Sequence, residues 1–422
     1  MDILNNLNLN KNKTLVLSIS GGVDSMVMLS LLHHSEYRIA VVHFDHMKRD
    51  NSKLEKELVE EYCKINDIPF YYYKLNIKSG NFHNEAHQLR KHYLQEVAKA
   101  NKTKYILTAH HQDDLLENVL IKLTRGSNLL GYAGMQQIYS KDGFTYVKPL
   151  LFTSKDELII YANENSINYL EDESNEEDFY LRNRYRHTIV PIMKQENEQL
   201  LKQVEKYNKQ ITSAFNYIRE NTIKLIGKTL EIDLNKYIKH SEALQDDMIA
   251  FLLEHYKLEV SYEIISKIKS LLLSSTPNLE YNLSKNHIFI KTYDKAFIMP
   301  LSKDSFRKST LKEGKNFFKN AVIFTLSTNN HPITEEFIKL CYNELAFPLV
   351  LRRRIDGDNL AFSYGHKKLK DFFIDEKVPK YLRDKLYILT DSNNNILWVE
   401  NYYLNDTLGD KNYLHFLLEK GE

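Results

Sequence analysis

The chain has little cysteine, no long apolar run and no excess of either charge, and each shortage narrows what it can be. Its 422 residues include only two cysteines, Cys63 and Cys341, which lie far apart in the sequence. This spacing offers neither a disulfide framework nor a Cys-x-x-Cys metal site. We therefore expect a protein of a reducing compartment, without zinc and without an iron–sulfur cluster.

Membrane and export signals are also missing. No apolar run reaches the length of a membrane span, and residues 1–13 lack the apolar core of a signal peptide. We therefore expect a cytoplasmic protein with no membrane partner. Lysine and arginine number 57 against 56 aspartate and glutamate residues, a net charge of +1. Proteins that bind nucleic acid through bulk charge are far more basic, so any RNA surface must be local.

Two common nucleotide-binding signatures are absent: the Gly-Lys-Ser/Thr of a Walker A loop and the Gly-x-Gly-x-x-Gly of a dinucleotide site. The sequence SGGVDS at 20–25 stands instead between a strand-like run and a helical pattern. Glycines let a backbone approach an anion, hydroxyl groups add donors, and a helix N-terminus adds partial positive charge. Small-residue turns are common by chance, but this context predicts a phosphate loop. Its residues are Ser20, Gly21, Gly22, Val23, Asp24 and Ser25.

Strand and helix patterns alternate in the first part of the chain, and repeated βα units favour an open parallel sheet that binds ligands at the carboxyl ends of its strands. A further α/β segment at 155–165 follows Pro149. The predicted strands are 15–19, 39–44, 69–75 and 105–108, and the predicted helices are 23–33, 53–66, 85–101 and 113–124.

The pattern changes near Pro191. Mostly helical stretches are expected at 195–226 and 243–275, and the alternation of apolar and polar residues at 278–298 predicts a hairpin. A loose polar stretch at 302–315 is expected to be a linker, and the last part, from about 326, mixes short strands with one or two helices.

Carboxylates and a histidine follow two of the predicted strands. Asp45 ends the second strand, where this architecture places it beside the phosphate loop, although a helix cap is the alternative. After the strand at 105–108 comes HHQDDLLEN, in which Glu117 shares a helix face with one or both of Asp113 and Asp114. Acids in a first helical turn stabilise it by about 0.3–1 kcal/mol with no function needed. His110 and Glu117 lack that explanation, and the absence of His-Glu-x-x-His argues against zinc.

Basic residues gather in several short runs, each with a structural alternative. Arg125 precedes Gly126 at a predicted helix end, where a cation also complements the helix dipole. The run YLRNRYRH at 180–187 offers phosphate contacts and base stacking, but such runs are often helix surface. Two clusters near 351–358 and 366–373 suit RNA backbone binding or a charged surface.

Together these segments resemble the tRNA(Ile)-lysidine synthetases, a family of PP-loop ATP pyrophosphatases. The resemblance covers nearly the whole chain and is weakest across about 195–325. It departs from the family near HFDHM at 43–47, where Arg49 is displaced, which leaves a role for Arg49 in doubt. The segments that carry it are 20–25, 43–46, 85–93, 109–127, 147–151, EDESN at 171–175, RNRYRH at 182–187, LRRRIDGD at 351–358, 367–379 and 396–399.

The resemblance implies a fold and a reaction. The fold is an α/β parallel-sheet PP-loop domain (adenine nucleotide alpha hydrolase-like) at 1–190, a mainly helical tRNA-binding domain at 191–325 and a small α+β tRNA-binding domain at 326–422. The reaction joins free L-lysine to the wobble cytidine of a tRNA(Ile) with a CAU anticodon, consuming ATP with Mg²⁺. The implied product is lysidine, with AMP and pyrophosphate released.

The resemblance also implies roles for particular residues. The loop at 20–25 would hold pyrophosphate, and Asp24 would help to position Mg²⁺. The catalytic candidates are Asp45, Asp114 and Glu117, and the lysine or metal candidates are His110, Asp113, Asp114 and Glu117. The tRNA-binding candidates are Arg90, Arg125, Arg182, Arg186, Arg352, Arg353, Lys367 and Lys368.

Three other functions stay open at this point. A PP-loop tRNA sulfur transferase would need nearby cysteines, which the isolated Cys63 and Cys341 do not provide. An amidating ligase would usually need an ammonia source and leaves the basic carboxyl-terminal part unexplained. A non-catalytic, nucleotide-gated RNA-binding module would not need the intact loop and its acids.

Overall fold

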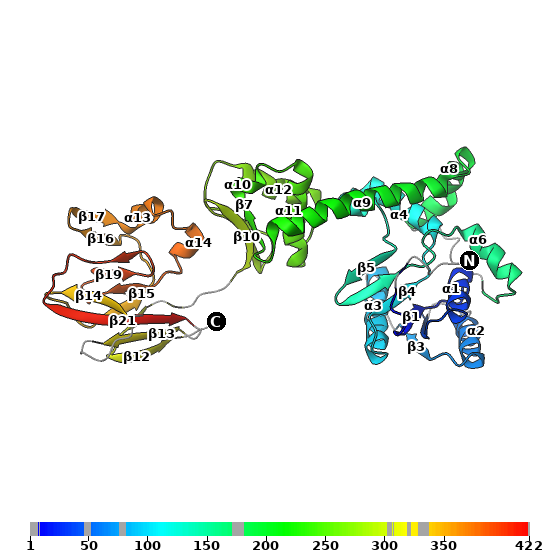
Figure 1. Cartoon of the computed structure of the whole chain (residues 1–422), viewed down its shortest axis with the longest axis horizontal. Coiled ribbons are helices and arrows are strands. Elements are labelled where there is room, and N and C mark those ends of the chain that lie inside the picture. Colours follow the sequence, from blue (N-terminus) through cyan, green and yellow to red (C-terminus); the bar gives the residue numbers. More distant parts are fainter. Residues whose placement is uncertain are drawn as a thin grey trace. The chain divides into compact units, whose positions relative to one another are not determined.

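The computed structural model describes residues 7, 9–45, 52–75, 82–170, 181–301, 306, 308–318, 322–327 and 337–420. The chain divides into two compact units, 1–218 and 219–422, and the division falls within the long helix α9 (Leu200–Ile226) (Figure 1). Within the described residues, no helix combines the length and apolar character that crossing a membrane requires.

A six-stranded sheet forms the centre of the first unit, in the order β3-β2-β1-β4-β6-β5. All neighbours pair in parallel except β5 and β6, which form an antiparallel hairpin. The chain leaves β1 for β2 on one side and later returns to β4 on the other. The carboxyl ends of β1 and β4 therefore flank the switch point at which such sheets bind ligands. The strands are β1 (Leu15–Ser18), β2 (Ile39–Asp45), β3 (Phe70–Lys74), β4 (Tyr105–Thr108), β5 (Ile138–Lys141) and β6 (Phe144–Val147).

Helices cover both faces of this sheet, which is why its central strands are continuous apolar runs. Leu15 and Leu17 point to the face that packs with α1, and Val16 points to the face that packs with α3. All three side chains are fully buried. The helices of this part are α1 (Val23–His33), α2 (Ser52–Ile65), α3 (Phe82–Ala100), α4 (Gln112–Arg125), α5 (Leu129–Tyr132) and α6 (Lys155–Glu164).

Residues after 190 also belong to the first unit by packing. Three helical segments follow one another: α7 (Leu181–Arg184), a π-helical segment (Tyr185–Ile189) and α8 (Val190–Glu196). In α9, Asn208 donates to the carbonyls of Ala133 at 2.7 Å and Met135 at 2.8 Å. The packing divides the chain within α9, and the domain boundaries predicted near 190 and 325 both stay predictions.

The second unit holds a small helical part and several antiparallel sheets. The predicted hairpin at 278–298 is confirmed, since β8 pairs with β9 and β9 with β10. The predicted linker at 302–315 is wrong in part, because β11 pairs with β15. The elements are β7 (Glu231–Asp233), α10 (Leu234–Tyr237), α11 (Glu242–His255), α12 (Tyr262–Leu273), β8 (Leu279–Asn282), β9 (His287–Lys291), β10 (Lys295–Pro300), β11 (Lys308–Thr310), β12 (Gly314–Phe318), β13 (Val322–Ser327), β14 (Ile338–Tyr342), β15 (Val350–Arg352), β16 (Asn359–Phe362), β17 (Gly365–Lys368), α13 (Leu369–Asp375), α14 (Lys380–Arg383), β18 (Ile388–Thr390), β19 (Ile396–Val399), β20 (Tyr403–Leu404) and β21 (Asn412–Lys420).

Candidate active site

The predicted phosphate loop joins the carboxyl end of β1 to the start of α1. Gly21 has a φ of +97°, a conformation that side chains with a Cβ rarely adopt. The buried hydroxyl of Ser25 accepts from the backbone N–H groups of Ser20 and Gly21, both at 3.2 Å, and donates to the carbonyl of Gly22 at 2.9 Å. Ser25 therefore shapes the loop from inside, and Gly22 caps the N-terminus of α1 with extended backbone.

Asp24 lies in the first turn of α1 and pairs with a residue that sequence reasoning missed. The Lys155 ammonium, from the start of α6, donates to both carboxylate oxygens of Asp24, at 2.7 and 2.9 Å. No local pattern could have found this pair, because 131 residues separate its members. Among the described residues no group of three or more potential ligands forms a metal cage. A single carboxylate does suit Mg²⁺ that is held mainly by substrate phosphates, once Lys155 moves aside.

Asp45 ends β2, next to β1, and is buried with 8% of its surface exposed. The hydroxyl of Tyr72, on the neighbouring strand β3, donates to its carboxylate at 2.7 Å. Burial, followed by this contact with Asp45, raises the pKa of Tyr72 to about 12, so the phenol stays protonated and a donor. His43, two residues earlier on β2, is bonded through Nδ1 to the carbonyl of Ile19 at 3.0 Å.

Asp113, at the start of α4, connects three helices. Its carboxylate accepts from the backbone N–H of Lys155 at 2.9 Å and from the ammonium of Lys194 in α8. Burial alone would raise the pKa of Asp113, but its contacts with His111 and Lys194 outweigh burial and hold the pKa well below its usual range. The described contacts make Asp113 an anchor for the site.

Asp114 and Glu117 share one face of α4, as the three-residue spacing predicts, and both are buried. Two arginines bridge them. Arg182 donates to Glu117 at 2.6 Å and to Asp114 at 2.7 Å, and Arg186 donates to the same two groups at 2.6 and 3.3 Å. The predicted lysine-binding acids and two predicted tRNA-binding arginines therefore form one cluster of balanced charge.

His111 links this cluster to the phosphate loop. Its Nε2 lies 3.7 Å from Asp24 and 3.5 Å from Asp114, and its Nδ1 lies 3.6 Å from Asp113. Burial lowers its pKa, but the three carboxylates outweigh burial and raise the pKa above its ordinary value. His111 therefore lies among three carboxylates that favour its protonated form. It went unrecognised in the sequence because its role depends on this tertiary arrangement.

His110 has the opposite electrostatics. Burial, opposed by Asp114 and reinforced by the charge of Lys148, lowers its pKa to about 4. Its Nδ1 lies 2.9 Å from the hydroxyl of Thr108, at the carboxyl end of β4. The ring is therefore neutral near pH 7, whereas the pKa of the adjacent His111 is shifted in the opposite direction.

Arg352, predicted to contact tRNA, has only 4% of its surface exposed, and its guanidinium donates to Asp358 at 2.7 and 2.9 Å. The neighbouring Arg353 stacks over the ring of Tyr387 at 3.7 Å and donates to a backbone carbonyl. In this structure Arg352 forms a buried ion pair with Asp358, and its predicted contact with tRNA stays a prediction.

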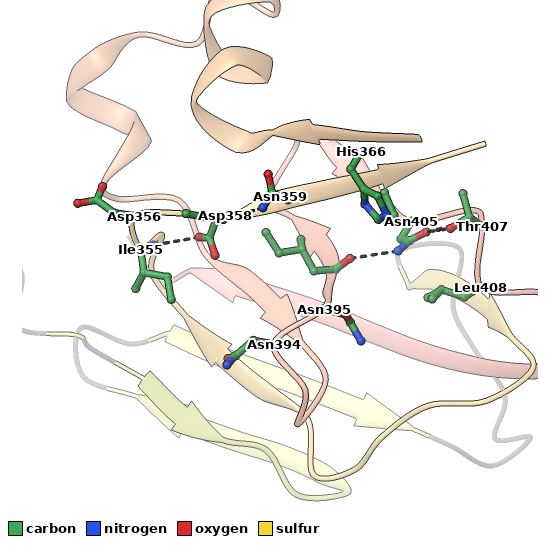
Figure 2. Close-up of a pocket in the computed structure, with 13 residues that line it drawn as sticks. Ile355, Asp356, Asp358, Asn359, His366, Asn394, Asn395, Asn405, Thr407 and Leu408 are labelled. Atoms are coloured by element: carbon green, nitrogen blue, oxygen red, sulfur yellow. Dashed lines mark hydrogen bonds between the residues drawn. The ribbon is translucent and has the colours of Figure 1, made fainter. Parts of the chain in front are cut away.

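A polar pocket of about 770 Å³ is lined in part by residues 355–359, and Figure 2 shows the side chains around it. Several of its polar groups are engaged within the protein: Asp358 accepts from the N–H of Ile355, and Asn405 donates to the carbonyl of Ile396. No lysine or arginine is among the residues that line it. Its lining therefore does not match the basic surface that was predicted for this region.

The remaining predicted contacts are dispersed. Arg125 is exposed at the end of α4, which Gly126 terminates with a φ of +78° as expected. Arg90 lies on α3, and Lys367 on β17 pairs with Asp375. Lys368 caps α13 through its backbone. The segments 46–50 and 171–180, which include Arg49 and EDESN, lie outside the described residues.

Comparisons with known proteins agree with this layout. Residues 1–193 match a family model described as a PP-loop domain, and residues 339–414 match one described as the TilS substrate C-terminal domain. The chain is 35% identical to the tRNA(Ile)-lysidine synthase of Aster yellows witches'-broom phytoplasma, across 96% of this chain and 93% of that protein. It is 28% identical to the tRNA(Ile)-lysidine synthase of Bacillus subtilis, across 94% and 92%. The Bifunctional protein TilS/HprT of Listeria monocytogenes is 30% identical, across 91% of this chain and 64% of that protein.

Proposed function

Since the chain belongs to the tRNA(Ile)-lysidine synthase family, we propose that it joins free L-lysine to C2 of the wobble cytidine in a tRNA(Ile) with a CAU anticodon. ATP adenylates the C2 oxygen and pyrophosphate leaves. The lysine side-chain amine then attacks C2, and AMP departs with the oxygen. The resulting lysidine pairs with A instead of G, which changes the codon read from AUG to AUA.

One observation carries this proposal: a phosphate loop and a set of buried carboxylates meet at the carboxyl edge of the sheet and are joined by His111. The loop at 20–25 and the N-terminus of α1 supply N–H groups and partial positive charge for the departing pyrophosphate. Asp24 is the residue that would hold Mg²⁺, which would neutralise phosphate charge when bound. Lys155, now paired with Asp24, would then be free to contact a phosphate oxygen.

The lysine amine needs carboxylates for a quantitative reason. An amine with a pKa of about 10.4 costs roughly 4.6 kcal/mol to neutralise at pH 7. Acids that bind the ammonium and then accept its proton lower that cost during attack. Asp114 and Glu117 are the groups proposed here for the ammonium, and Asp45 is proposed to act near the reacting base.

Two arginines, Arg182 and Arg186, occupy these acids in the structure, so the acids can pair either with the arginines or with an incoming ammonium. Arg182 and Arg186 now neutralise Asp114 and Glu117, with side chains 40% and 32% exposed. An incoming ammonium competes for the same oxygens, and an arginine displaced by it becomes available for an RNA or nucleotide phosphate. Binding lysine and binding phosphate are then coupled through one cluster.

Sulfur transfer has less support than lysine ligation. Burial raises the pKa of the Cys63 thiol to about 12, so this cysteine is a poor nucleophile. No disulfide or cysteine pair joins it to Cys341, since both are free in the described structure.

The direct assay of this proposal measures transfer of labelled lysine to the CAU isoleucine tRNA, with pyrophosphate release followed in parallel. Transfer that requires ATP and is abolished by Asp24→Ala is the expected result. If pyrophosphate were released only in the presence of tRNA and no lysine were transferred, the nucleophile would be a different one. No release from folded protein would favour the RNA-binding module.

A further inference from the structure

A second pocket, of about 280 Å³, lies on the α3 side of the sheet and has no assigned role. Side chains from α3 face those from β4, β5 and β6 across it, and its floor includes Ser18 and Thr108 at the carboxyl ends of β1 and β4. We call it the α3 pocket. The cationic and imidazole groups that line it are His87, Arg90, Lys91, His110, Lys141 and Lys148.

The cations of the α3 pocket lack acidic partners in its lining, which contains no aspartate or glutamate. Only 8% of the surface of Lys148 is exposed. In the described contacts its ammonium meets only neutral groups, the carbonyl of Gln136 at 3.3 Å and the ring of Tyr139 at 4.5 Å. Burial lowers its pKa to about 8. Burial likewise lowers the pKa of Arg90, and among the described residues no acid opposes that effect.

The cations of the α3 pocket also act on one another. Arg90, Lys91 and Lys141 each lower the pKa of His87, so the positive groups interact with one another. Lys91 has an outside partner, Asp142, at 2.6 Å. Lys148 is the buried cation of this group, and a buried cation without a counter-charge is costly. An anion bound in the α3 pocket would relieve that cost and could pair at the same time with the partly exposed Arg90.

The α3 pocket adjoins the catalytic cluster through His110. This ring bonds to Thr108 in the pocket floor, and Asp114 and Lys148 shift its pKa in opposite directions. The phosphate loop leads into α1, whose side chains pack on the opposite face of the sheet from α3. A group in the α3 pocket therefore approaches the site from the other side of the sheet.

We propose that the α3 pocket binds a backbone phosphate of the tRNA beside the target cytidine, with Arg90 and Lys148 as its principal contacts. This inference rests on the proposed function. A phosphodiester carries one negative charge and several acceptor oxygens, which fits a cluster of lysine, arginine and imidazole donors. An RNA phosphate is favoured over a phosphate of ATP because the chain already offers ATP a phosphate loop on the α1 side. The contact positions the base without reading it.

The first test compares Arg90→Gln and Lys148→Gln with Lys99→Gln. Lys99 lies on the same helix as Arg90, is 64% exposed and pairs only with Glu96 in the described contacts. Equilibrium binding of the full-length tRNA is measured without ATP across a salt series. Each pocket variant is expected to weaken binding about tenfold and to reduce the salt slope by about one unit, while Lys99→Gln changes neither. Affinity for an ATP analogue should be unchanged in all three.

The second test pairs the protein with altered RNA. A methylphosphonate, which is neutral, replaces one phosphate at a time next to the target cytidine. At one position this replacement should weaken tRNA binding by the wild type about tenfold. It should cause no further loss of tRNA binding in Arg90→Gln, which already lacks the contact. Unchanged tRNA binding in folded Arg90→Gln would overturn the inference, and so would loss of ATP-analogue affinity instead, which would assign the pocket to the nucleotide. Lysine transfer by the wild type is scored separately, so its absence would refute the proposed function and leave the binding result readable.

Discussion

At the scale of single residues, the site depends on pairs of identical side chains that their surroundings make different. Two adjacent histidines have pKa values shifted in opposite directions, and two adjacent aspartates bond to different helices. The identity of a residue alone could not have assigned these states. Three predictions concern single residues of the site, and the last of them tests the state of His110.

Glu117→Gln should raise the KM for lysine about tenfold or more and change the KM for ATP little. Glu117 is 1% exposed, and the amide cannot replace the charge that an ammonium requires. Steady-state lysine transfer measures both constants, with the exposed Glu164→Gln as the control. If Glu117→Gln left both the lysine KM and the turnover unchanged, its assignment would be wrong.

Gly21→Ala should abolish tRNA-dependent pyrophosphate release. Gly21 has a φ of +97°, so a side chain shifts the loop or strains it by roughly 1–2 kcal/mol. Gly143→Ala is a matched control, since Gly143 has a φ of +81°, has open space for a Cβ and lies in the β5–β6 turn. We expect both variants to lose a similar amount of stability, and only Gly21→Ala to lose pyrophosphate release. Equal losses of release would show that strain alone is responsible.

His110 should make the protein less stable in mild acid. Its pKa is about 4 in the folded state and about 6.5 when exposed. Between these values the unfolded chain binds a proton that the folded chain does not, so stability falls as pH falls through this window. The loss reaches at most about 2 kcal/mol by pH 5, an upper bound because the ring is partly exposed. Urea unfolding of the wild type and of His110→Asn at pH 7 and pH 5 measures this loss. An equal loss of unfolding free energy in the two proteins between these pH values would contradict this account.

At the scale of elements, buried ion pairs stabilise the turns and helix ends that they join. Arg352→Ala should destabilise the chain by about 3–5 kcal/mol, because it leaves the buried Asp358 without its partner. Arg354→Ala, which breaks a pair with the 70% exposed Asp384, should cost no more than about 1 kcal/mol. Urea unfolding of the full chain compares them. A loss below about 1 kcal/mol for Arg352→Ala would show that the buried pair with Asp358 contributes no more than a surface pair.

Local sequence predicted the elements better than it predicted their partners. Helix α1 was predicted within its observed bounds, because an apolar strand, a glycine turn and a helical pattern adjoin one another. The stretch at 243–275 forms two helices, α11 and α12, whose shared composition conceals the turn between them. Strand β11 has three residues and is defined by its pairing with β15, which no local pattern encodes.

The candidate site was predictable to the same extent. The shared face of Asp114 and Glu117 follows from helical spacing, and the phosphate loop follows from its glycines. The partners of these groups could not be inferred. Lys155 and Arg182 meet Asp24 and Glu117 across 131 and 65 residues, so only the tertiary fold brings them together.

At the scale of the whole molecule, a net charge of +1 means that RNA recognition depends on where cations lie. The first unit concentrates them around the carboxyl edge of its sheet, in the arginine pair and in the α3 pocket. In the second unit Arg352 is buried, and the pocket lined by residues 355–359 has no lysine or arginine in its lining. We therefore expect the first unit to carry part of the tRNA contact itself.

The central claim is best tested on the wobble nucleoside itself. Purified protein is incubated with ATP, Mg²⁺, lysine and the CAU isoleucine tRNA, and the nucleosides are analysed by mass. The account predicts a cytidine that gains the mass of lysine minus water, and no gain with Asp24→Ala. An unmodified cytidine after incubation with folded, tRNA-binding protein would contradict it.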